Sequence, residues 1–467
     1  MLSELVEEFL LDYLKRRPYI VKTKRDNQRV TTMSELIKSI AEVEMVIRDN
    51  KDKTPEEIVD LIIKDTIKQY ENIREKYGVP GYSASSKVGN VDVAILSGKT
   101  STDGFEISED TLFDVASITK IYTQIVVYNL IKDGFLKRSD KIKDLDNRFI
   151  NLDNITVGDI LTFSVEFMTP GRIDDKKTYD DALSTLYNTT VVQKRKYNYN
   201  DIGLMVMKEV IEKLTGKTFN QLVEQYIITP LNLKNTYLIV PEDRYSFLTG
   251  TPNAKIGHVT DMKANLSKDG YSGHAGVFTN SSDLSKTLSA AHSGVILPNS
   301  IDARTPSKLY GKNGKKRDYV GKMGNTYVAH IDGIDKSFVD SVDPLDTFAV
   351  AGSTRTNAAV SSDSAYTILF NPSSISEEEA KFQINKMNEE KIKNNSKPID
   401  LNNAIKHYSV NGDSEYNYID PRSIMPLSSM EDAVRKMAEL TIKLRFLDYV
   451  IKKSEKDYET TVIKHVG

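Results

Sequence analysis

The spacing of hydrophobic residues predicts helices at the start of the chain, then strands, then a long helical block. Residues 54–77 open with Thr-Pro-Glu-Glu, a capping threonine followed by a proline and two acids, and apolar residues then recur at helical spacing. Within residues 82–96, two apolar runs flank a Gly-Asn pair, which predicts a β-hairpin. A long apolar helix is predicted next, from residue 117 to about residue 134.

The second half of the chain returns to strand patterns before it closes with a helix. Helices joined by loops are predicted up to about residue 300, and an amphipathic helix spans about residues 430–453. Residues 376–417 are rich in Lys, Asn and Glu, which predicts surface structure with mobile loops. Strand-like runs lie at residues 326–331, 347–351, 357–361 and 366–370.

This order of elements predicts an α+β fold. An antiparallel β-sheet is flanked by N- and C-terminal helices, and an all-helical lobe is inserted between the first and later strands. Such an architecture creates a cleft where lobe and sheet meet. We expect a charged helical extension at residues 1–54 and one domain at residues 55–467. Within that domain, residues 55–120 and 320–467 form the sheet region and residues 121–319 the mostly helical lobe.

Composition removes several classes of function. The chain has no cysteine, which excludes a disulfide scaffold, a thiolate zinc site, an iron–sulfur cluster and a cysteine nucleophile. With 63 Lys and Arg against 66 Asp and Glu, the net charge is −3, so we expect no nucleic-acid partner. The six histidines form no H-E-x-x-H pattern, and no glycine-rich phosphate loop follows a strand. We therefore expect neither a metal nor another cofactor.

The chain shows no sequence of the kind that crosses or enters a membrane. Charges break its apolar stretches well before the ~18 residues that a bilayer requires. Acidic residues interrupt the N-terminal segment 1–17 where a secretory signal would be basic and then apolar. We expect a cytoplasmic protein from the sequence as it stands, and an extracytoplasmic one if an N-terminal segment has been removed. The oligomeric state is left open.

The most informative segment is residues 116–120, Ala-Ser-Ile-Thr-Lys, an S-x-x-K motif at the start of the long apolar helix. Residues three apart share a helix face, so the Lys120 amine can reach the Ser117 hydroxyl. A serine hydroxyl needs a base, and lysine serves as one if burial and the positive end of the helix lower its pKa. The N–H groups of that helix end can also stabilise an oxyanion. Taken alone, the motif is more typical of a helix cap followed by a surface lysine.

The sequence segments around the S-x-x-K motif favour its catalytic interpretation. Residues 111–120 read T-L-F-D-V-A-S-I-T-K, and this stretch resembles the nucleophile signature of the serine β-lactamase and penicillin-binding protein family. The similarity is to the class C and low-molecular-weight D-Ala-D-Ala peptidase and esterase branch. Further similar blocks follow in the family's order: D-G-F-L at 133–136, I-T-V-G-D-I-L-T at 155–162, V-I-E-K-L-T-G-K at 210–217, P-L-N-L-K-N-T at 230–236 and G-H-A-G-V-F at 273–278.

The resemblance implies a second motif, Y-x-N or Y-x-D. Residues 197–201 read Tyr-Asn-Tyr-Asn-Asp and offer two registers. Counting back from the block at 210–217 favours Tyr199-Asn200-Asp201. Tyr199 would then be the phenol that passes the Ser117 proton to the leaving group, and Asp201 would orient Lys120 or bind a substrate amide. The alternative is that Tyr199 only packs in a loop that enters a helix.

The third family motif, [KH]-[TS]-G on a strand, is altered. After the apolar run 348–351 the chain reads Gly-Ser-Thr-Arg-Thr. By alignment, Ser353 replaces the basic residue, Thr354 keeps its place and Arg355 replaces the glycine, while Thr356 supplies the second oxyanion N–H. The loss of the cation weakens the case for a carboxylate-bearing β-lactam. Arg355 either restores the charge or crowds the cleft.

Two further observations bear on the same motif. His274-Ala275-Gly276 is an alternative H-x-G element, although it leads into a predicted helix rather than a strand. The pattern is equally typical of His274 as a structural loop histidine. After Leu161, the family's usual T-H-T-S-G-L is replaced by residues 162–167, Thr-Phe-Ser-Val-Glu-Phe, so the backbone turn there must differ.

Together these features predict a metal-free serine hydrolase that acts through a Ser117 acyl-enzyme on an amide or ester. The substrate would be a small molecule or a peptidoglycan-like peptide: a D-amino-acid peptide, a small ester or a β-lactam. The alternative is a non-catalytic binding or scaffold protein that keeps the fold. The altered third motif supports the alternative, whereas the intact Ser117, Lys120 and Tyr199 support the enzyme.

Overall fold

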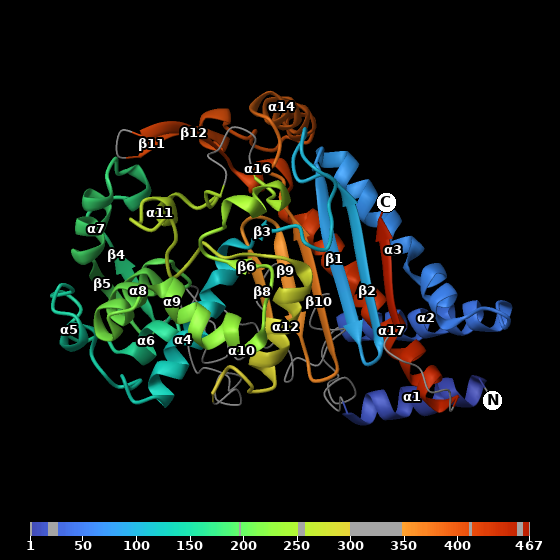
Figure 1. Cartoon of the computed structure of the whole chain (residues 1–467). Coiled ribbons are helices and arrows are strands. Elements are labelled where there is room, and N and C mark those ends of the chain that lie inside the picture. The colour runs from blue at the N-terminus through green and yellow to red at the C-terminus, as the bar shows by residue number, and fades with distance from the viewer. Residues whose placement is uncertain are drawn as a thin grey trace.

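The computed structural model describes residues 2–16, 27–195, 198–250, 257–298, 348–410, 413–454 and 461–466. A β-sheet lies between a helical lobe on one side and the terminal helices on the other (Figure 1). Among the described helices, none has both the length and the apolar character needed to cross a bilayer. The arrangement is the α+β architecture that the order of elements predicts, with the lobe inserted between β2 (Val91–Gly98) and β8 (Phe348–Gly352).

The central sheet is antiparallel except at one edge, where the last strand pairs parallel to β2. The hairpin predicted at residues 82–96 and the strands predicted near 347–351, 357–361 and 366–370 are all present. The strand predicted at 326–331 lies outside the described residues. In spatial order the strands are β13 (Thr461–Val466), β2 (Val91–Gly98), β1 (Gly81–Val88), β10 (Ser364–Phe370), β9 (Thr356–Val360) and β8 (Phe348–Gly352).

Side chains alternate between the two faces of the sheet, as strand geometry requires. Val350, Ala358 and Leu369 join the core of the helical lobe. Ala349 and Ile368 belong to the core on the opposite face, which is covered by α3 (Pro55–Tyr77) and α17 (Leu427–Lys453). The predicted C-terminal helix is thus confirmed, and the capping box at Thr54 starts α3 as its sequence predicts.

The N-terminal helices α1 (Leu2–Arg16) and α2 (Asn27–Asp49) lie against α17 (Figure 1). Phe9, Ile40 and Val43 are buried in the same core as α17 and the sheet. Lys443 of α17 forms an ion pair of 2.7 Å with Glu42. The charged segment 1–54 therefore contributes to the core of the sheet region, and its status as a separate extension stays a prediction.

The helical lobe is built around α4 (Thr119–Lys132), a helix with every residue from Thr119 to Leu130 buried. It is entered from the short strand β3 (Phe113–Asp114) through the one-turn helix η1 (Ala116–Ile118). The helix α12 (Ser281–His292) returns the chain from the lobe to the sheet. The other helices of the lobe are α5 (Ile142–Leu145), α6 (Val157–Leu161), η2 (Ile173–Asp175), α7 (Tyr179–Tyr187), α8 (Ile202–Thr215), α9 (Phe219–Val223), η3 (Glu224–Ile228), α10 (Thr229–Leu231), η4 (Glu242–Phe247) and α11 (Met262–Asn265). Its strands are β4 (Val165–Met168), β5 (Thr190–Lys194), β6 (Thr236–Tyr237) and β7 (Phe278–Thr279).

The polar segment 376–417 is more regular than its composition predicts. It forms α14 (Glu377–Lys393), α15 (Leu401–Ala404) and the hairpin of β11 (Ile405–Val410) and β12 (Asp413–Ile419), followed by α16 (Pro421–Ile424). A small apolar core that includes Ile384 and Ile419 holds these elements together. In the view of Figure 1 the hairpin lies above the lobe, and Tyr408 of β11 packs against the lobe's hydrophobic core. Isolated apolar positions in a charged segment are enough to bury a small core once they converge.

Candidate active site

The turn before Ser117 is strained and held by one carboxylate. Ala116 has a φ of 44°, a left-handed conformation that is costly for a residue with a Cβ. The Asp114 side chain accepts hydrogen bonds from the backbone N–H of Ala116 at 2.8 Å and of Thr260 at 2.6 Å. The strain is therefore maintained by buried hydrogen bonds, and it places Ser117 at the N-terminal end of α4.

Ser117 and Lys120 are in direct contact, as the S-x-x-K spacing predicts. The Lys120 Nζ donates to the Ser117 Oγ at 2.7 Å and to the His274 carbonyl oxygen at 3.2 Å. The Lys120 side chain is completely buried, whereas Ser117 is partly exposed. The structure thus gives solvent access to the hydroxyl but not to the amine.

The segment 273–277 supports this helix from the side. The Gly273 carbonyl oxygen accepts from the Thr123 hydroxyl at 2.6 Å, and the Val277 N–H donates to the Thr119 hydroxyl at 3.0 Å. A Cβ at Gly273 would lie 2.1 Å from the Leu204 carbonyl oxygen of α8, so only glycine fits there. The segment 273–277 and the helix α8, which are far apart in the sequence, thus together support α4.

Tyr199 lies over Lys120. The Lys120 Nζ is 5.0 Å from the centroid of the Tyr199 ring, and the ring is 40% exposed. Its other neighbour is Phe163, which stacks on it with ring centroids 5.2 Å apart. Phe163 has a φ of 52°, which is the altered turn chemistry expected after Leu161. Tyr197, the alternative register, lies outside the described residues.

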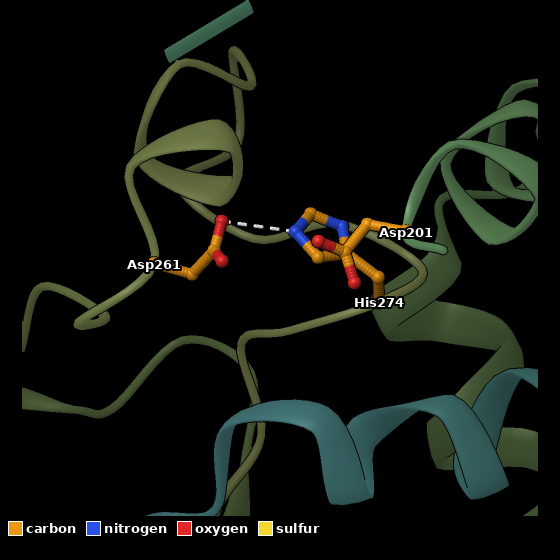
Figure 2. A group of neighbouring side chains, drawn as sticks. All are labelled: Asp201, Asp261 and His274. Carbon is orange, nitrogen blue, oxygen red and sulfur yellow. Dashed lines mark hydrogen bonds and ion pairs between the residues drawn. The ribbon is translucent and has the colours of Figure 1, made fainter. Parts of the chain in front are cut away.

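Asp201 connects Lys120 to a wider network of charges. Its Oδ1 lies 2.9 Å from the Lys120 Nζ, and its Oδ2 lies 3.2 Å from the Nζ of Lys263. Lys263 also contacts the Oδ2 of Asp261 at 3.3 Å, and the Oδ1 of Asp261 lies 2.9 Å from the Nε2 of His274. Because the His274 carbonyl accepts from Lys120, these residues form a closed ring, which we call the charge ring. Figure 2 shows His274 beside Asp201, with its hydrogen bond to Asp261.

The charge ring raises the pKa of Lys120, which is the opposite of the lowering that its role as a base requires. Burial disfavours the ammonium, but the Asp201 carboxylate and the Tyr199 hydroxyl outweigh it, so the pKa of Lys120 lies above its usual value. Burial likewise opposes the charge on Asp201, but Lys120, His274 and Lys263 hold its pKa well below the ordinary range. In the resting site Lys120 is therefore an ammonium ion, and Asp201, the acid that causes this, is the residue that the resemblance already placed beside Lys120.

The same residues resemble a set of metal ligands. Asp201, Asp261 and His274 each bring one donor atom within 4.8 Å of the others. However, the ammonium of Lys263 contacts both carboxylates, and that of Lys120 contacts Asp201. A divalent cation would have to displace these two charges, so the donor set fits an ion-pair network and we assign no metal to it.

The third motif is placed differently from its sequence alignment. Residues 353–355 form the turn between β8 and β9 rather than part of a strand. Thr356 lies inside the sheet, paired with Gly352 on one side and Leu369 on the other, so its N–H is not on a free edge. The expected role of Thr356 as an oxyanion donor is therefore wrong, because that strand has a neighbour on both sides.

The side chains of this turn are also directed elsewhere. The Thr354 hydroxyl donates to the Asp114 carbonyl oxygen at 2.7 Å, and the Arg355 Nε donates to the Met425 carbonyl oxygen at 2.6 Å. Arg355 is buried, with a φ of 61°, and burial lowers its pKa to about 10. It therefore neither restores the missing charge nor crowds the cleft, while Ser353 is exposed.

The end of β8 reaches the nucleophile turn. A Cβ at Gly352 would lie 2.4 Å from the Val115 carbonyl oxygen, so these two backbones are in close contact. In the part of the chain that the structure describes, β8 is the edge strand of the sheet. The backbone N–H that follows Gly352, that of Ser353, is thus the nearest candidate for a second oxyanion donor.

Sequence reasoning missed Lys263 and Asp261. They lie in a loop and a short helix, α11, outside the similar blocks. The one local signal is that Asp261 caps α11, accepting from the N–H groups of Lys263 and Ala264 at 2.9 and 3.2 Å. Nothing in that pattern indicates a contact with Asp201.

The comparisons with known proteins identify the family. The Beta-lactamase family model matches residues 64–371 of the 467 residues. The chain therefore belongs to the serine β-lactamase and penicillin-binding protein family, as the resemblance around Ser117 predicts.

Two curated relatives match a shorter part of the chain. The chain is 30% identical over 216 residues to an N-acetylmuramyl-L-alanine amidase of Bacillus subtilis (strain 168), covering 38% of this chain and 49% of the relative. It is 26% identical over 223 residues to a putative D-alanyl-D-alanine carboxypeptidase of Salmonella gallinarum (strain 287/91 / NCTC 13346), covering 40% and 52%. The chain thus spans about half the length of the curated relatives it matches.

Solved structures support the fold. A class C β-lactamase from Rhodobacter sphaeroides superposes with a TM-score of 0.52 at 15% identity, covering 66% of this chain and 93% of the other. A D-alanine carboxypeptidase from Burkholderia cenocepacia gives a TM-score of 0.50 at 17% identity, covering 66% and 93%. The predicted β-lactamase/transpeptidase-like fold is confirmed.

Proposed function

We propose that the protein is a serine hydrolase that cleaves an amide or ester through an acyl-enzyme on Ser117. The observation that carries the proposal is the contact of 2.7 Å between the partly exposed Ser117 Oγ and the buried Lys120 Nζ. A buried lysine that contacts an accessible hydroxyl at a strained helix entry is typical of an activated nucleophile.

The Ser117 Oγ would bond to the substrate carbonyl carbon. Its proton would pass to the Lys120–Tyr199 pair once that pair has lost one proton, and from there to the leaving amine or alcohol. Water would then attack the acyl-ester and release the acid.

The oxyanion of the tetrahedral intermediate would be bound by the N–H groups of Ser117 and Ser353. The contact between Gly352 and Val115 supports this pairing, because it brings the end of β8 to the nucleophile turn. Two such donors are the usual requirement for stabilising the charge that develops on a carbonyl oxygen.

The substrate class is proposed from the names of the relatives. An amidase and carboxypeptidases are named among them, so we propose an amide bond of a peptidoglycan-like peptide as the scissile bond. The described part of β8 and its turn present no accessible cation, which makes a carboxylate-bearing β-lactam a less suitable substrate.

Covalent labelling tests this function. Incubation of the full chain with a fluorophosphonate probe should give a stable adduct that mass spectrometry places on Ser117, and Ser117→Ala should abolish it. Ser85→Ala is a matched control, because Ser85 lies in β1 and bonds to Thr367. An unlabelled Ser117 would instead support a non-catalytic binding protein, the alternative that the altered third motif favours.

A further inference from the structure

Lys263 belongs to the charge ring, but the proposed chemistry assigns it no role. Its Nζ lies 3.2 Å from Asp201 and 3.3 Å from Asp261, so it competes with Lys120 for the same Asp201 carboxylate. Its side chain is 21% exposed, and it also lines a cavity of about 590 Å³ in the helical lobe. A second ammonium this close to Lys120 must act on its proton affinity.

The charged groups around Lys263 come from several elements. Asp174 of η2 and Tyr408 of β11 interact electrostatically with it. Arg172 pairs with Asp174, and Tyr418 of β12 lies within electrostatic range of Asp261. The remaining groups are Asp201, Asp261, His274, Lys120 and Tyr199, whose contacts are given above.

Two effects of Lys263 on Lys120 have the same sign. The positive charge of Lys263 repels a proton on Lys120, and its bond to Asp201 takes up part of the carboxylate that would otherwise stabilise the Lys120 ammonium. Asp261 has the opposite effect, because it is an anion and because it draws Lys263 away from Asp201. The ring thus contains one cation, Lys263, that favours deprotonation of Lys120, and two carboxylates, Asp201 and Asp261, that oppose it.

We propose that Lys263 is a positioning residue that lowers the proton affinity of the Lys120–Tyr199 pair and so raises the fraction of active enzyme at neutral pH. The inference rests on the proposed acyl-enzyme function. Lys263 acts through Asp201 and through space, without contact to Ser117.

The test is the rate of fluorophosphonate labelling of Ser117 in the full chain as a function of pH. In Lys263→Met the midpoint of the rate profile should move to higher pH by on the order of one unit, with a roughly tenfold slower reaction below the midpoint. Lys263→Arg keeps the charge and should return the midpoint toward that of the wild type. Lys268→Met, an exposed lysine that lines the same cavity outside the ring, is the matched control and should leave the profile unchanged.

Asp261→Asn gives the decisive contrast, because its midpoint should move to lower pH. A purely structural role would slow both variants without shifting their midpoints in opposite directions, and that result would overturn the proposal. Equal midpoints in the wild type and Lys263→Met would overturn it as well. If wild-type Ser117 remains unlabelled at every pH, the proposed function itself is wrong.

Discussion

At the scale of single residues, the site is organised by one strained alanine and one buried lysine. Ala116 keeps its φ of 44° because the Asp114 carboxylate accepts hydrogen bonds from the N–H groups of Ala116 and Thr260. Lys120 is fully buried because Asp201, Ser117 and the His274 carbonyl together replace its water shell. A buried charge with three such partners also contributes to folding, so nucleophile activation and stability share the same contacts.

Removal of this charge should therefore cost stability as well as activity. Lys120→Met removes the nearer of the two lysines that pair with Asp201, and we expect a loss of about 3 kcal/mol in the free energy of unfolding at neutral pH. The measurement is urea denaturation followed by circular dichroism. A variant as stable as the wild type would show that the pair adds nothing to folding.

The same loss should depend on pH with a definite sign. The pKa of Asp201 is lowered in the folded chain, so its contribution is present above its unfolded pKa of about 4 and declines as the pH falls below that value. The pKa of Lys120 is raised, so its contribution is lost only above about pH 10. The difference between the wild type and Lys120→Met should thus shrink below about pH 4. A difference that is constant between neutral and acid pH would contradict the ion-pair explanation.

At the scale of elements, the candidate active site is a junction between α4, α8 and the segment 273–277. At Gly273 this junction leaves no room for a side chain, since a Cβ there would lie 2.1 Å from the Leu204 carbonyl oxygen of α8. Its own carbonyl binds the Thr123 hydroxyl on α4. Three elements from different parts of the chain are thereby fixed relative to one another within a few ångströms of Lys120.

A methyl group at this junction should force the elements apart. We expect Gly273→Ala to lower the free energy of unfolding by about 2–3 kcal/mol, because backbone has to move to admit the Cβ. Labelling of Ser117 should slow at the same time. Gly250→Ala is the control, since a Cβ there meets nothing within 4 Å and should leave both stability and labelling unchanged. Thermal denaturation and labelling rates together decide the outcome.

At the scale of the whole molecule, the N-terminal helices and α17 bury one face of the sheet, while the lobe buries the other. Ile40 of α2 is 1% exposed in the core shared with α17, whereas Ile37, one turn earlier, is 51% exposed. The terminal segments are thus placed to stabilise the strands that carry β8 to the nucleophile.

A pair of truncations tests whether residues 1–54 fold as part of the domain. Ile40→Ala should cost about 3 kcal/mol in the main unfolding transition, because it leaves a cavity in that core. Ile37→Ala should leave the transition unchanged. If Ile40→Ala shifts only a separate, minor transition, the extension is independent of the domain, as the predicted boundary at residue 54 would have it.

The sequence alone determined the chemistry-bearing residues and the order of the elements. Ser117 and Lys120 meet because a spacing of three residues places both side chains on the same helix face, and Tyr199 is reached by counting from a neighbouring block. The alternation of the strands and the capping of α3 were readable for the same reason, since these features depend on local backbone geometry.

Only the tertiary structure decided what surrounds those residues. The contact of Lys263 and Asp261 with Asp201, the direction of the Lys120 pKa and the interior position of Thr356 depend on which distant segments pack together. No local spacing encodes such contacts, because segments 60 or more residues apart approach one another only when helices and strands bury their apolar faces. The electrostatics of this site are thus a property of the folded chain.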